Sequence, residues 1–272
     1  MIKYLLILRF FFVIVLLSAQ IEGRQRVRVL NLSDRLVPFQ DAWAWQTQLM
    51  KYQIDLQDCK SQSDAEKIVG HVLLLQHKSV YTLGTASESG SGPFSTTTAN
   101  GDILEYEVFE IDRAGQATYH GPGQIVMYPI LDLRFFEKDI NTYLRGLEEM
   151  TIDTLSKYDI TGTRKDALTG VWVGTSKVAA IGVKLRRWVT MHGVALNVDP
   201  DLRYFDNIVP CGISDSELSV GAIAKWVPGT TVSDIAPRLL ESFTSHFDVC
   251  VEELSGHSAV AYLDGLTSQH QS

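Results

Sequence analysis

The segment RAGQATYHGPGQIVMYPILDL, residues 113–133, organises the rest of this 272-residue chain. Glycines and a proline are so frequent in its first half that neither a helix nor a regular strand is expected there. Its second half is an apolar run, residues 125–133, that predicts a buried strand. The loop also brings polar side chains toward a core, where polar groups need hydrogen-bond partners. These side chains are Arg113, Gln116, Thr118, Tyr119, His120 and Gln124. We therefore interpret the loop as part of a ligand site, with a plain connecting turn as the alternative.

Composition limits the class of protein. With 45% hydrophobic residues and no proline-rich linker, the chain can form the core of one large domain. We predict a hydrophobic leader at residues 1–25, a folded domain at residues 26–254 and a polar C-terminal tail at residues 255–272. The net charge of −8 argues against a nucleic-acid partner, and three sparse cysteines are typical of a reducing compartment.

The leader bears on the compartment. Residues 5–17 are almost wholly apolar, which is short for a membrane span and typical of the hydrophobic part of a secretory signal. We expect this segment to be cleaved and the protein to have no stable membrane association afterwards. An uncleaved anchor is the alternative.

Hydrophobic periodicity predicts helices and strands in a mixed order. Helical spacing occurs at residues 39–56, 140–158 and 231–247, with Asp139 and either Thr231 or Ser233 as N-caps. Pro237 suggests a later start for the last of these helices. Strand patterns occur at residues 26–32, 68–76, 80–83, 103–111 and 125–133, and residues 171–198 predict an antiparallel meander. Residues 90–100 and 201–210 are expected to be irregular. Because helices and strands do not alternate strictly, we predict a single mixed α/β (α+β) domain, with a mixed sheet and flanking helices.

Cys211 is the candidate nucleophile, because it lies between Pro210 and Gly212, outside any periodic segment. A cysteine in such a place has no packing role, whereas Cys59 and Cys250 fit the usual pattern of a buried apolar cysteine. The thiolate is the reactive form, so Cys211 needs a neighbour that favours the charged state.

Lys177 and two histidines are candidate partners of this cysteine. Lys177 directly follows a turn and opens a strand. His120 and His192 each precede a glycine, and either could act as a base or as a hydrogen-bond donor. The alternatives are a solvated surface lysine and two structural histidines. We expect no metal, because no pair of Cys or His has zinc spacing, and the motifs of phosphate-binding and dinucleotide-binding loops are missing.

Five motifs, taken in order, resemble one family. They are YTLG (residues 81–84), the opening segment (113–133), KVAAIGVKL (177–185), HGVALNV (192–198) and PCGI (210–213). Their order and spacing resemble the lipoate-protein ligase B family, the octanoyl-[acyl-carrier-protein]:protein octanoyltransferases, over about residues 26–254. The runs QHKSVYTLGTAS (76–87) and LTGVWVGTSKVAAIGVK (168–184) are most similar to plastid-type members of plants and algae.

The resemblance implies a fold and a reaction. The family fold is a mixed α/β domain shared with the catalytic domains of biotin and lipoate protein ligases. The reaction moves an octanoyl group from the phosphopantetheine thiol of octanoyl-acyl carrier protein to a lysine of a lipoyl domain, without a cofactor. The implied acceptors are the lipoyl domains of 2-oxoacid dehydrogenase complexes and the glycine-cleavage H protein.

The resemblance also implies the site residues. Cys211 matches the acyl-thioester nucleophile, and Lys177 matches the lysine that lowers the cysteine pKa and acts as acid and base. The implied substrate-binding residues are Arg113, Ala114, Gly115, Gln116, Ala117, Thr118, Tyr119, His120, Ala180, Ile181, Gly182, Gly193, Val194 and Ala195.

Ala114 departs from the family pattern, which has two glycines after the arginine. If that position needs a positive φ, alanine costs about 1 kcal/mol. If it needs only a small residue, alanine is tolerated.

Two rival functions stay open at this point. One is an ATP-dependent lipoate or biotin protein ligase on the same fold, which would leave the PCGI motif unexplained. The other is a non-catalytic binder of acyl carrier protein or lipoyl domains. For the compartment, the hydrophobic leader favours a plastid reached by a secretory-type route, with the mitochondrion as the alternative.

Overall fold

The computed structural model of the chain describes residues 23–59, 67–87, 106–166, 168–208 and 217–269. The leader, the expected loop at residues 90–100 and the predicted nucleophile Cys211 lie outside the described residues.

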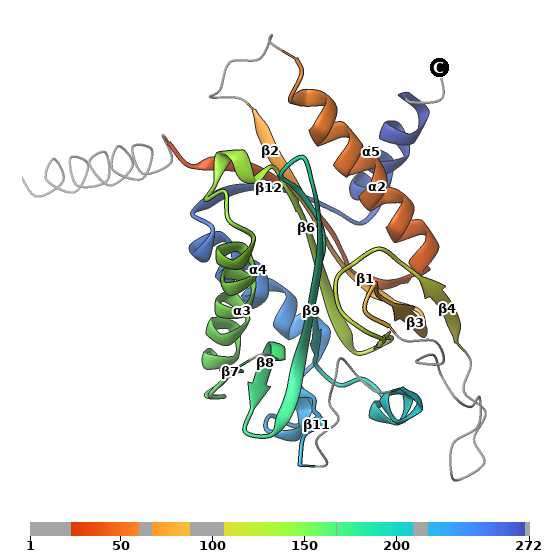
Figure 1. Cartoon of the computed structure of the whole chain (residues 1–272), viewed down its shortest axis with the longest axis vertical. Helices are drawn as coiled ribbons and strands as arrows, with labels where there is room; N and C mark the ends of the chain where they lie inside the picture. The colour runs from red at the N-terminus through yellow and green to blue at the C-terminus, as the bar shows by residue number, and fades with distance from the viewer. Residues whose placement is uncertain (1–22, 60–66, 88–105, 167, 209–216, 270–272) are drawn as a thin grey trace, which may run out of the picture.

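A large mixed sheet forms the middle layer of the domain (Figure 1). Within the described residues, its strands follow the order β12-β1-β2-β6-β10-β9-β8-β7, and β11 pairs with β9. β1 is parallel to both β12 and β2, whereas the strands from β2 to β7 along this order pair antiparallel. The predicted antiparallel meander is therefore β8, β9 and β10. The strand bounds are β1 Gln25–Val37, β2 Ile68–His77, β6 Gln124–Leu131, β7 Thr163–Lys165, β8 Leu168–Val173, β9 Ser176–Arg186, β10 Val189–Asn197, β11 Ser219–Val220 and β12 Val249–Ser255.

A small sheet of β3 (Val80–Leu83), β4 (Glu107–Glu110) and β5 (Thr118–His120) carries part of the opening segment. We expected no regular strand in residues 113–123, but β5 forms there and pairs antiparallel with β3. The glycines lie on either side of these three residues, at Gly115 and Gly121, and leave them free to extend. The strand predicted at residues 103–111 is shorter in the described part, where β4 begins at Glu107.

Helices cover both faces of the large sheet (Figure 1). α3 (Ile140–Ser156) and α4 (Val232–His246) pack on one face, and α2 (Phe39–Leu56) and α5 (Gly256–Gln269) pack on the other. Short 3-10 helices occur at Leu133–Phe135, Leu202–Asn207 and Ile223–Lys225. The prediction of one mixed α/β domain with flanking helices is confirmed. Among the described residues, no helix is long and apolar enough to span a membrane.

Side-chain caps set the starts of α3 and α4. The Asp139 carboxylate accepts a hydrogen bond from the backbone N–H of Thr142 at 2.7 Å, as predicted. At α4, Asp234 accepts from the backbone N–H of Thr231 at 2.9 Å. The expectation that Pro237 delays this helix is wrong, because the helix starts at Val232. The capped first turn lies before Pro237, so the missing proline N–H does not prevent its formation.

Most of the predicted polar tail is instead helix α5. Ala259, Leu263 and Leu266 are buried against the face of the sheet that α2 also covers. These residues have helical spacing, but two glycines and several polar residues mask the pattern in the sequence. The folded unit therefore extends past residue 254 to α5.

Leu263→Ala should lower the free energy of unfolding by about 2–5 kcal/mol, because it removes a fully buried side chain. Val260→Ala, on the same helix at a half-buried position, should cost clearly less. Urea denaturation of the two variants measures the difference. Equal and negligible effects would mean that α5 is not packed on the sheet.

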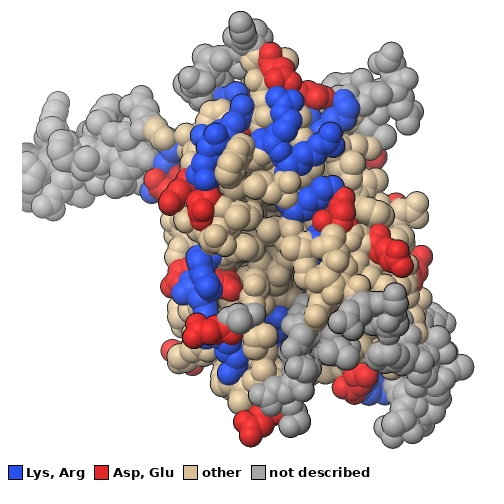
Figure 2. All heavy atoms as spheres, viewed as in Figure 1, with Lys and Arg blue, Asp and Glu red and all other residues tan. Residues whose placement is uncertain are grey.

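Lysines and arginines gather at one end of the face in Figure 2, the end that carries β2 at the top of Figure 1. In the turn after β9, Arg187 pairs with Asp58 at 2.9 Å, and this contact lowers the pKa of Asp58. β9 runs from Ser176 to Arg186, so this turn and Lys177 lie at opposite ends of the strand. The ion pair of Arg187 and Asp58 is therefore separate from the region of Lys177.

Candidate active site

Lys177 lies at the start of β9 and is only 5% exposed. Its register partner on β8 is Trp172, and its Nζ atom lies 5.6 Å from the centre of the indole ring. A cation over an aromatic ring is attracted by the electrons of the ring face. The alternative of a solvated surface lysine is therefore wrong, and the ammonium group is held in a defined place inside the protein.

Gly170 on β8 provides the space for this side chain. Its φ is +131°, and a Cβ atom there would come within 2.7 Å of the Lys177 Cε atom and 2.5 Å of the Ala179 carbonyl oxygen. Both contacts are too short for carbon. A larger residue at position 170 must therefore displace Lys177 or the backbone of β9.

Gly170→Ala should reduce the acyl transfer that the family resemblance implies by roughly tenfold to a hundredfold, because small displacements of a catalytic lysine have effects of that size. Gly174→Ala is the matched control: it also has a positive φ, of +60°, but nothing lies within 4 Å of its Cβ position. Single-turnover transfer rates compare the two variants. Equal losses would show that backbone strain, not contact with Lys177, is responsible.

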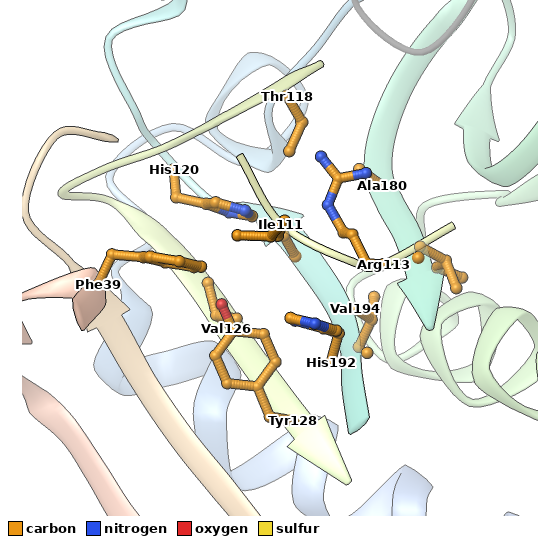
Figure 3. Close-up of a pocket in the computed structure, with 14 residues that line it drawn as sticks. Phe39, Ile111, Arg113, Thr118, His120, Val126, Tyr128, Ala180, His192 and Val194 are labelled. Atoms are coloured by element: carbon orange, nitrogen blue, oxygen red, sulfur yellow. The ribbon is translucent and has the colours of Figure 1, made fainter. Parts of the chain in front are cut away.

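A pocket lies above the middle of β9 and β10 (Figure 3). Small residues form its floor, because Gly182 pairs with Gly193 and Ala180 with Ala195 across the two strands. Small side chains leave space above a sheet, and the loop of residues 111–120 and β6 supply the walls. The lining residues are Phe39, Ile111, Arg113, Thr118, His120, Val126, Tyr128, Ala180, Ile181, Gly182, His192, Gly193, Val194 and Ala195.

Most of the predicted substrate-binding residues meet in this pocket. They are Arg113, Thr118, His120, Ala180, Ile181, Gly182, Gly193, Val194 and Ala195. The predicted residues Ala114, Gly115, Gln116, Ala117 and Tyr119 do not line it. Of these, Tyr119 packs in an aromatic cluster, with its ring 4.5 Å from that of Tyr204. The antiparallel register of β9 and β10 is what brings the two glycine-containing segments together.

Ala114 does not have a positive φ, whereas Gly115 does, at 97°. The backbone N–H of Ala114 donates to the Val183 carbonyl at 3.1 Å, which ties the loop to β9. The glycine that the family has at the position of Ala114 could be needed for a positive φ or for its small size. Only the need for a small residue fits the conformation of Ala114. Alanine is therefore tolerated there without backbone strain.

Four further residues line the pocket that no sequence pattern had selected: Phe39, Ile111, Val126 and Tyr128. Val126 and Tyr128 alternate along β6, so the two-residue period of a strand places them on one face. That period could have identified them once the face of the site was known. Nothing in the sequence pattern marks Phe39, the first residue of α2.

Three buried histidines gather around Tyr128. His77 accepts a hydrogen bond from the Tyr128 hydroxyl at 2.8 Å, and the rings of His77 and His120 are 5.6 Å apart. The ring of His192 lies 6.2 Å from that of Tyr128. Burial lowers the pKa of His77 and of His192 to about 4. Burial also lowers the pKa of His120 well below its ordinary value. All three rings are therefore neutral at pH 7.

His192 has an unusual backbone for a strand residue, with a φ of 61°. Its backbone N–H points toward α2 and donates to the side-chain oxygen of Gln46 at 2.9 Å. Its Nε2 atom lies 3.6 Å from a carboxylate oxygen of Asp112, beyond hydrogen-bond distance. A strained, buried residue of this kind commonly belongs to a functional site. Figure 3 shows His192 and Tyr128 at the end of the pocket opposite Thr118.

The Arg113 guanidinium forms one wall of the pocket (Figure 3). Its Nη2 atom donates to the carbonyl and hydroxyl oxygens of Thr82, at 2.9 and 3.0 Å. Its Nη1 atom donates to the Ala114 carbonyl at 3.2 Å. Arg113 therefore joins the loop to β3 of the small sheet and fixes the wall against the floor.

Comparison with solved structures shows which fold this is. A crystal structure of lipoate-protein ligase A bound with ATP aligns with a TM-score of 0.59 and 12% identity, covering 90% of this chain and 95% of that one. A bipartite lipoate protein ligase from Thermoplasma acidophilum aligns with a TM-score of 0.59 and 12% identity, covering 90% and 92%. At these identities the similarity establishes the fold alone.

Comparison with sequences goes further. The family model for the lipoyl protein ligase A/B catalytic domain matches residues 38–244. An octanoyltransferase of Nostoc punctiforme is 44% identical over 214 residues, covering 79% of this chain and 86% of the relative. A chloroplastic octanoyltransferase of Arabidopsis thaliana is 43% identical over 190 residues, covering 70% of this chain and 64% of the relative. The chain is an acyltransferase and belongs to the lipoate-protein ligase B family, the octanoyltransferases.

Proposed function

We propose that the protein transfers an octanoyl group from octanoyl-acyl carrier protein to a lysine of lipoyl domains, through a thioester on Cys211. The observation that carries this proposal is the burial of Lys177 on β9, the strand whose Ala180–Gly182 segment forms half of the pocket floor. The octanoyltransferase relatives give the acyl group its identity. The PCGI motif supplies the nucleophile, which lies outside the described residues.

The first half of the reaction forms an acyl-enzyme. With its ammonium near Cys211, Lys177 favours the thiolate over the thiol. The thiolate attacks the carbonyl carbon of the octanoyl thioester, a new carbon–sulfur bond forms, and the bond to the pantetheine sulfur breaks. The departing pantetheine thiolate takes the proton of the Lys177 ammonium. One thioester replaces another, so this step is close to balanced in free energy.

The second half moves the octanoyl group to an amine. The neutral ε-amino group of the acceptor lysine attacks the Cys211 thioester, and the Lys177 amine accepts the proton that the new amide must lose. The Cys211 thiolate leaves. The enzyme returns to its starting state, with a thiolate and an ammonium.

The pocket is the proposed site of the acyl chain. Its floor of Ala180, Gly182, Gly193 and Ala195 gives an unbranched chain a smooth apolar surface. A Cβ atom on Gly182 would come within 2.9 Å of the Ala114 carbonyl oxygen, so the space between floor and loop depends on that glycine. The geometry suits a narrow chain better than a ring system.

The proposed acceptors are the lipoyl domains of 2-oxoacid dehydrogenase complexes and the glycine-cleavage H protein. The proposed location is an organelle, with the plastid favoured because one relative is a chloroplastic enzyme. The proposed route into the plastid is a secretory-type leader at residues 1–25, and the mitochondrion is the alternative.

A transfer assay separates this function from its rivals. The full-length chain is incubated with a lipoyl domain and either octanoyl-acyl carrier protein alone or free octanoate with ATP, and the mass of the lipoyl domain is measured. We expect octanoylation with the carrier-bound donor alone. Octanoylation only with octanoate and ATP would identify a ligase, and binding without transfer in both arms would identify a non-catalytic binder.

A further inference from the structure

A continuous line of hydrogen bonds runs from the pocket wall to the backbone of Lys177. On the pocket side, Arg113 donates to the Thr82 hydroxyl at 3.0 Å, and the Thr82 hydroxyl lies 3.4 Å from His120 Nε2. His120 Nδ1 lies 2.7 Å from the side-chain oxygen of Gln124. Each of these side chains is buried.

The line continues through two buried amides. The Gln124 amide nitrogen donates to the side-chain oxygen of Asn197 at 2.9 Å. The Asn197 amide nitrogen donates to the Gly221 carbonyl at 2.9 Å. The Gly221 N–H then donates to the carbonyl of Lys177 at 2.9 Å.

Two backbone carbonyls fix the direction of this line. The Gln124 nitrogen also donates to the Tyr119 carbonyl at 3.1 Å, and the Asn197 nitrogen donates to the Gly221 carbonyl. A carbonyl oxygen can only accept a hydrogen bond. Flipping either side-chain amide by half a turn would therefore place its oxygen against a backbone carbonyl oxygen. The Gln124 oxygen therefore faces His120 Nδ1.

The direction of the line determines the tautomer of His120. Nδ1 must carry the proton, because it faces an amide oxygen at 2.7 Å. His120 is neutral, so Nε2 carries a lone pair. In the described part of the chain, the one hydrogen-bonding contact of Nε2 is with the Thr82 hydroxyl, and at 3.4 Å it is long enough for a closer N–H group in the pocket to replace it. His120 therefore presents an acceptor to the pocket, and of the two roles that the sequence left open it cannot be the donor.

The position of His120 indicates what it can accept from. Gln124 and Asn197 face each other across β6 and β10, and Leu196 pairs with Ala179, so the amide pair lies at the Lys177 end of the pocket. At the reacting centre, the thioester brings a carbonyl oxygen and a sulfur, and neither carries a proton. Among the substrate atoms that form or break bonds in the two half-reactions, only the nitrogen of the attacking amine carries protons. An imidazole that can only accept therefore matches the amine and not the thioester.

We propose that His120 accepts a hydrogen bond from the ε-amino group of the acceptor lysine, and that Gln124 and Asn197 are positioning residues that hold it in this tautomer. The proposal rests on the proposed octanoyl transfer. The line ends on the Lys177 carbonyl, so Gln124 and Asn197 hold His120 at a fixed position relative to Lys177. The nitrogen of the acceptor lysine, bound to His120, is thereby held at a fixed position relative to Lys177 as well. From His120 Nδ1 to the Lys177 carbonyl, all bonds point the same way, an arrangement in which each bond strengthens the next.

The tautomer can be observed directly in the full-length protein without substrate. Nitrogen-15 NMR of the histidine rings should show His120 protonated on Nδ1. Two other buried histidines are internal references. His77 should have the same tautomer, because its Nδ1 faces the Val37 carbonyl at 3.0 Å. His71 should have the opposite one, because Gln53 donates to its Nδ1 at 3.2 Å. A proton on Nε2 of His120 would overturn the proposal whatever the enzyme catalyses.

The two half-reactions test the role. Gln124→Leu and Asn197→Leu should slow transfer from the acyl-enzyme to the lipoyl domain by roughly tenfold to a hundredfold, while acyl-enzyme formation changes less than about twofold. Gln53→Leu is the matched control, because Gln53 is also a buried glutamine bonded to a histidine but lies outside the pocket. It should leave both half-reactions unchanged.

Gln124→Glu adds a second measurement, the pH dependence of transfer, which would not change if Gln124 had a purely structural role. The added carboxylate favours protonated His120 and raises its pKa, and a protonated ring has no acceptor to offer. Relative to wild type at the same pH, transfer by this variant should fall as the pH is lowered through the raised pKa of His120. Equal losses in both half-reactions, or identical pH profiles, would overturn the positioning role alone. A wild-type enzyme that forms no acyl-enzyme would instead overturn the proposed function.

Discussion

Lys177→Met should reduce octanoyl transfer by roughly 10²- to 10⁴-fold while the protein stays folded. Methionine keeps the unbranched stem that packs between Trp172 and the space over Gly170, and it removes only the ammonium. In the proposed mechanism, loss of that charge removes the stabilisation of the Cys211 thiolate and leaves no group to accept the proton of the incoming amine. Both half-reactions should therefore slow, in contrast to the variants of Gln124 and Asn197.

Lys165→Met is the matched control for this change. Lys165 Nζ lies 5.4 Å from the centre of the same Trp172 ring, on the neighbouring strand β7. The two substitutions remove the same charge from the same aromatic residue, but only Lys177 has the role proposed here at the Cys211 thioester. Single-turnover rates and thermal unfolding are measured for both variants. Comparable activity losses would show that the charge around Trp172, not Lys177 itself, matters.

The free energy of unfolding should fall steeply as the pH drops from 6.5 toward 4. Burial lowers the pKa of His77 and His192 to about 4 and that of His71 to about 3. Burial also lowers the pKa of His120. In the unfolded chain these histidines titrate near their ordinary value of about 6.5. Below that pH the unfolded state binds more protons than the folded state, so stability is complete above about 6.5 and is lost as the pH falls.

The expected slope is large because four groups act together. Each contributes about 1.4 kcal/mol per pH unit between its unfolded and folded pKa. With a typical domain stability of about 5–15 kcal/mol, cooperative unfolding is expected above pH 4. Urea denaturation at several pH values measures the slope, and His77→Gln should reduce it by the share of one histidine. A flat profile between pH 7 and 5 would mean that these rings are not buried as neutral groups.

Local patterns predicted the elements well, and the limits of that prediction have physical causes. The bounds of α2 and β3 follow from apolar spacing and from the glycine that ends β3, so both were predicted at their observed residues. α5 was missed because its buried residues are few and lie among glycines and polar residues. β5 was missed because its three residues extend only when β3 is beside them.

The pocket was predictable only in part, for a similar reason. Arg113, His120 and the segments at residues 180–182 and 193–195 carry motifs that the family resemblance selects. Phe39 and Tyr128 complete the wall through tertiary packing, which no local pattern encodes. The line of hydrogen bonds from Arg113 to the Lys177 carbonyl depends on how β6, β9, β10 and β11 pair. The sequence alone does not show this pairing, so the contact between Gln124 and Asn197 could not be predicted from it.

The most direct measurement of the central claim is the intact mass of the full-length protein after brief incubation with octanoyl-acyl carrier protein, without a lipoyl domain. Wild type is compared with Cys211→Ser and Lys177→Met. We predict one octanoyl adduct on wild type that hydroxylamine removes, none on Cys211→Ser, and much slower formation on Lys177→Met. Wild type that octanoylates a lipoyl domain without ever carrying the adduct, or Cys211→Ser that carries a hydroxylamine-sensitive adduct, would contradict the account.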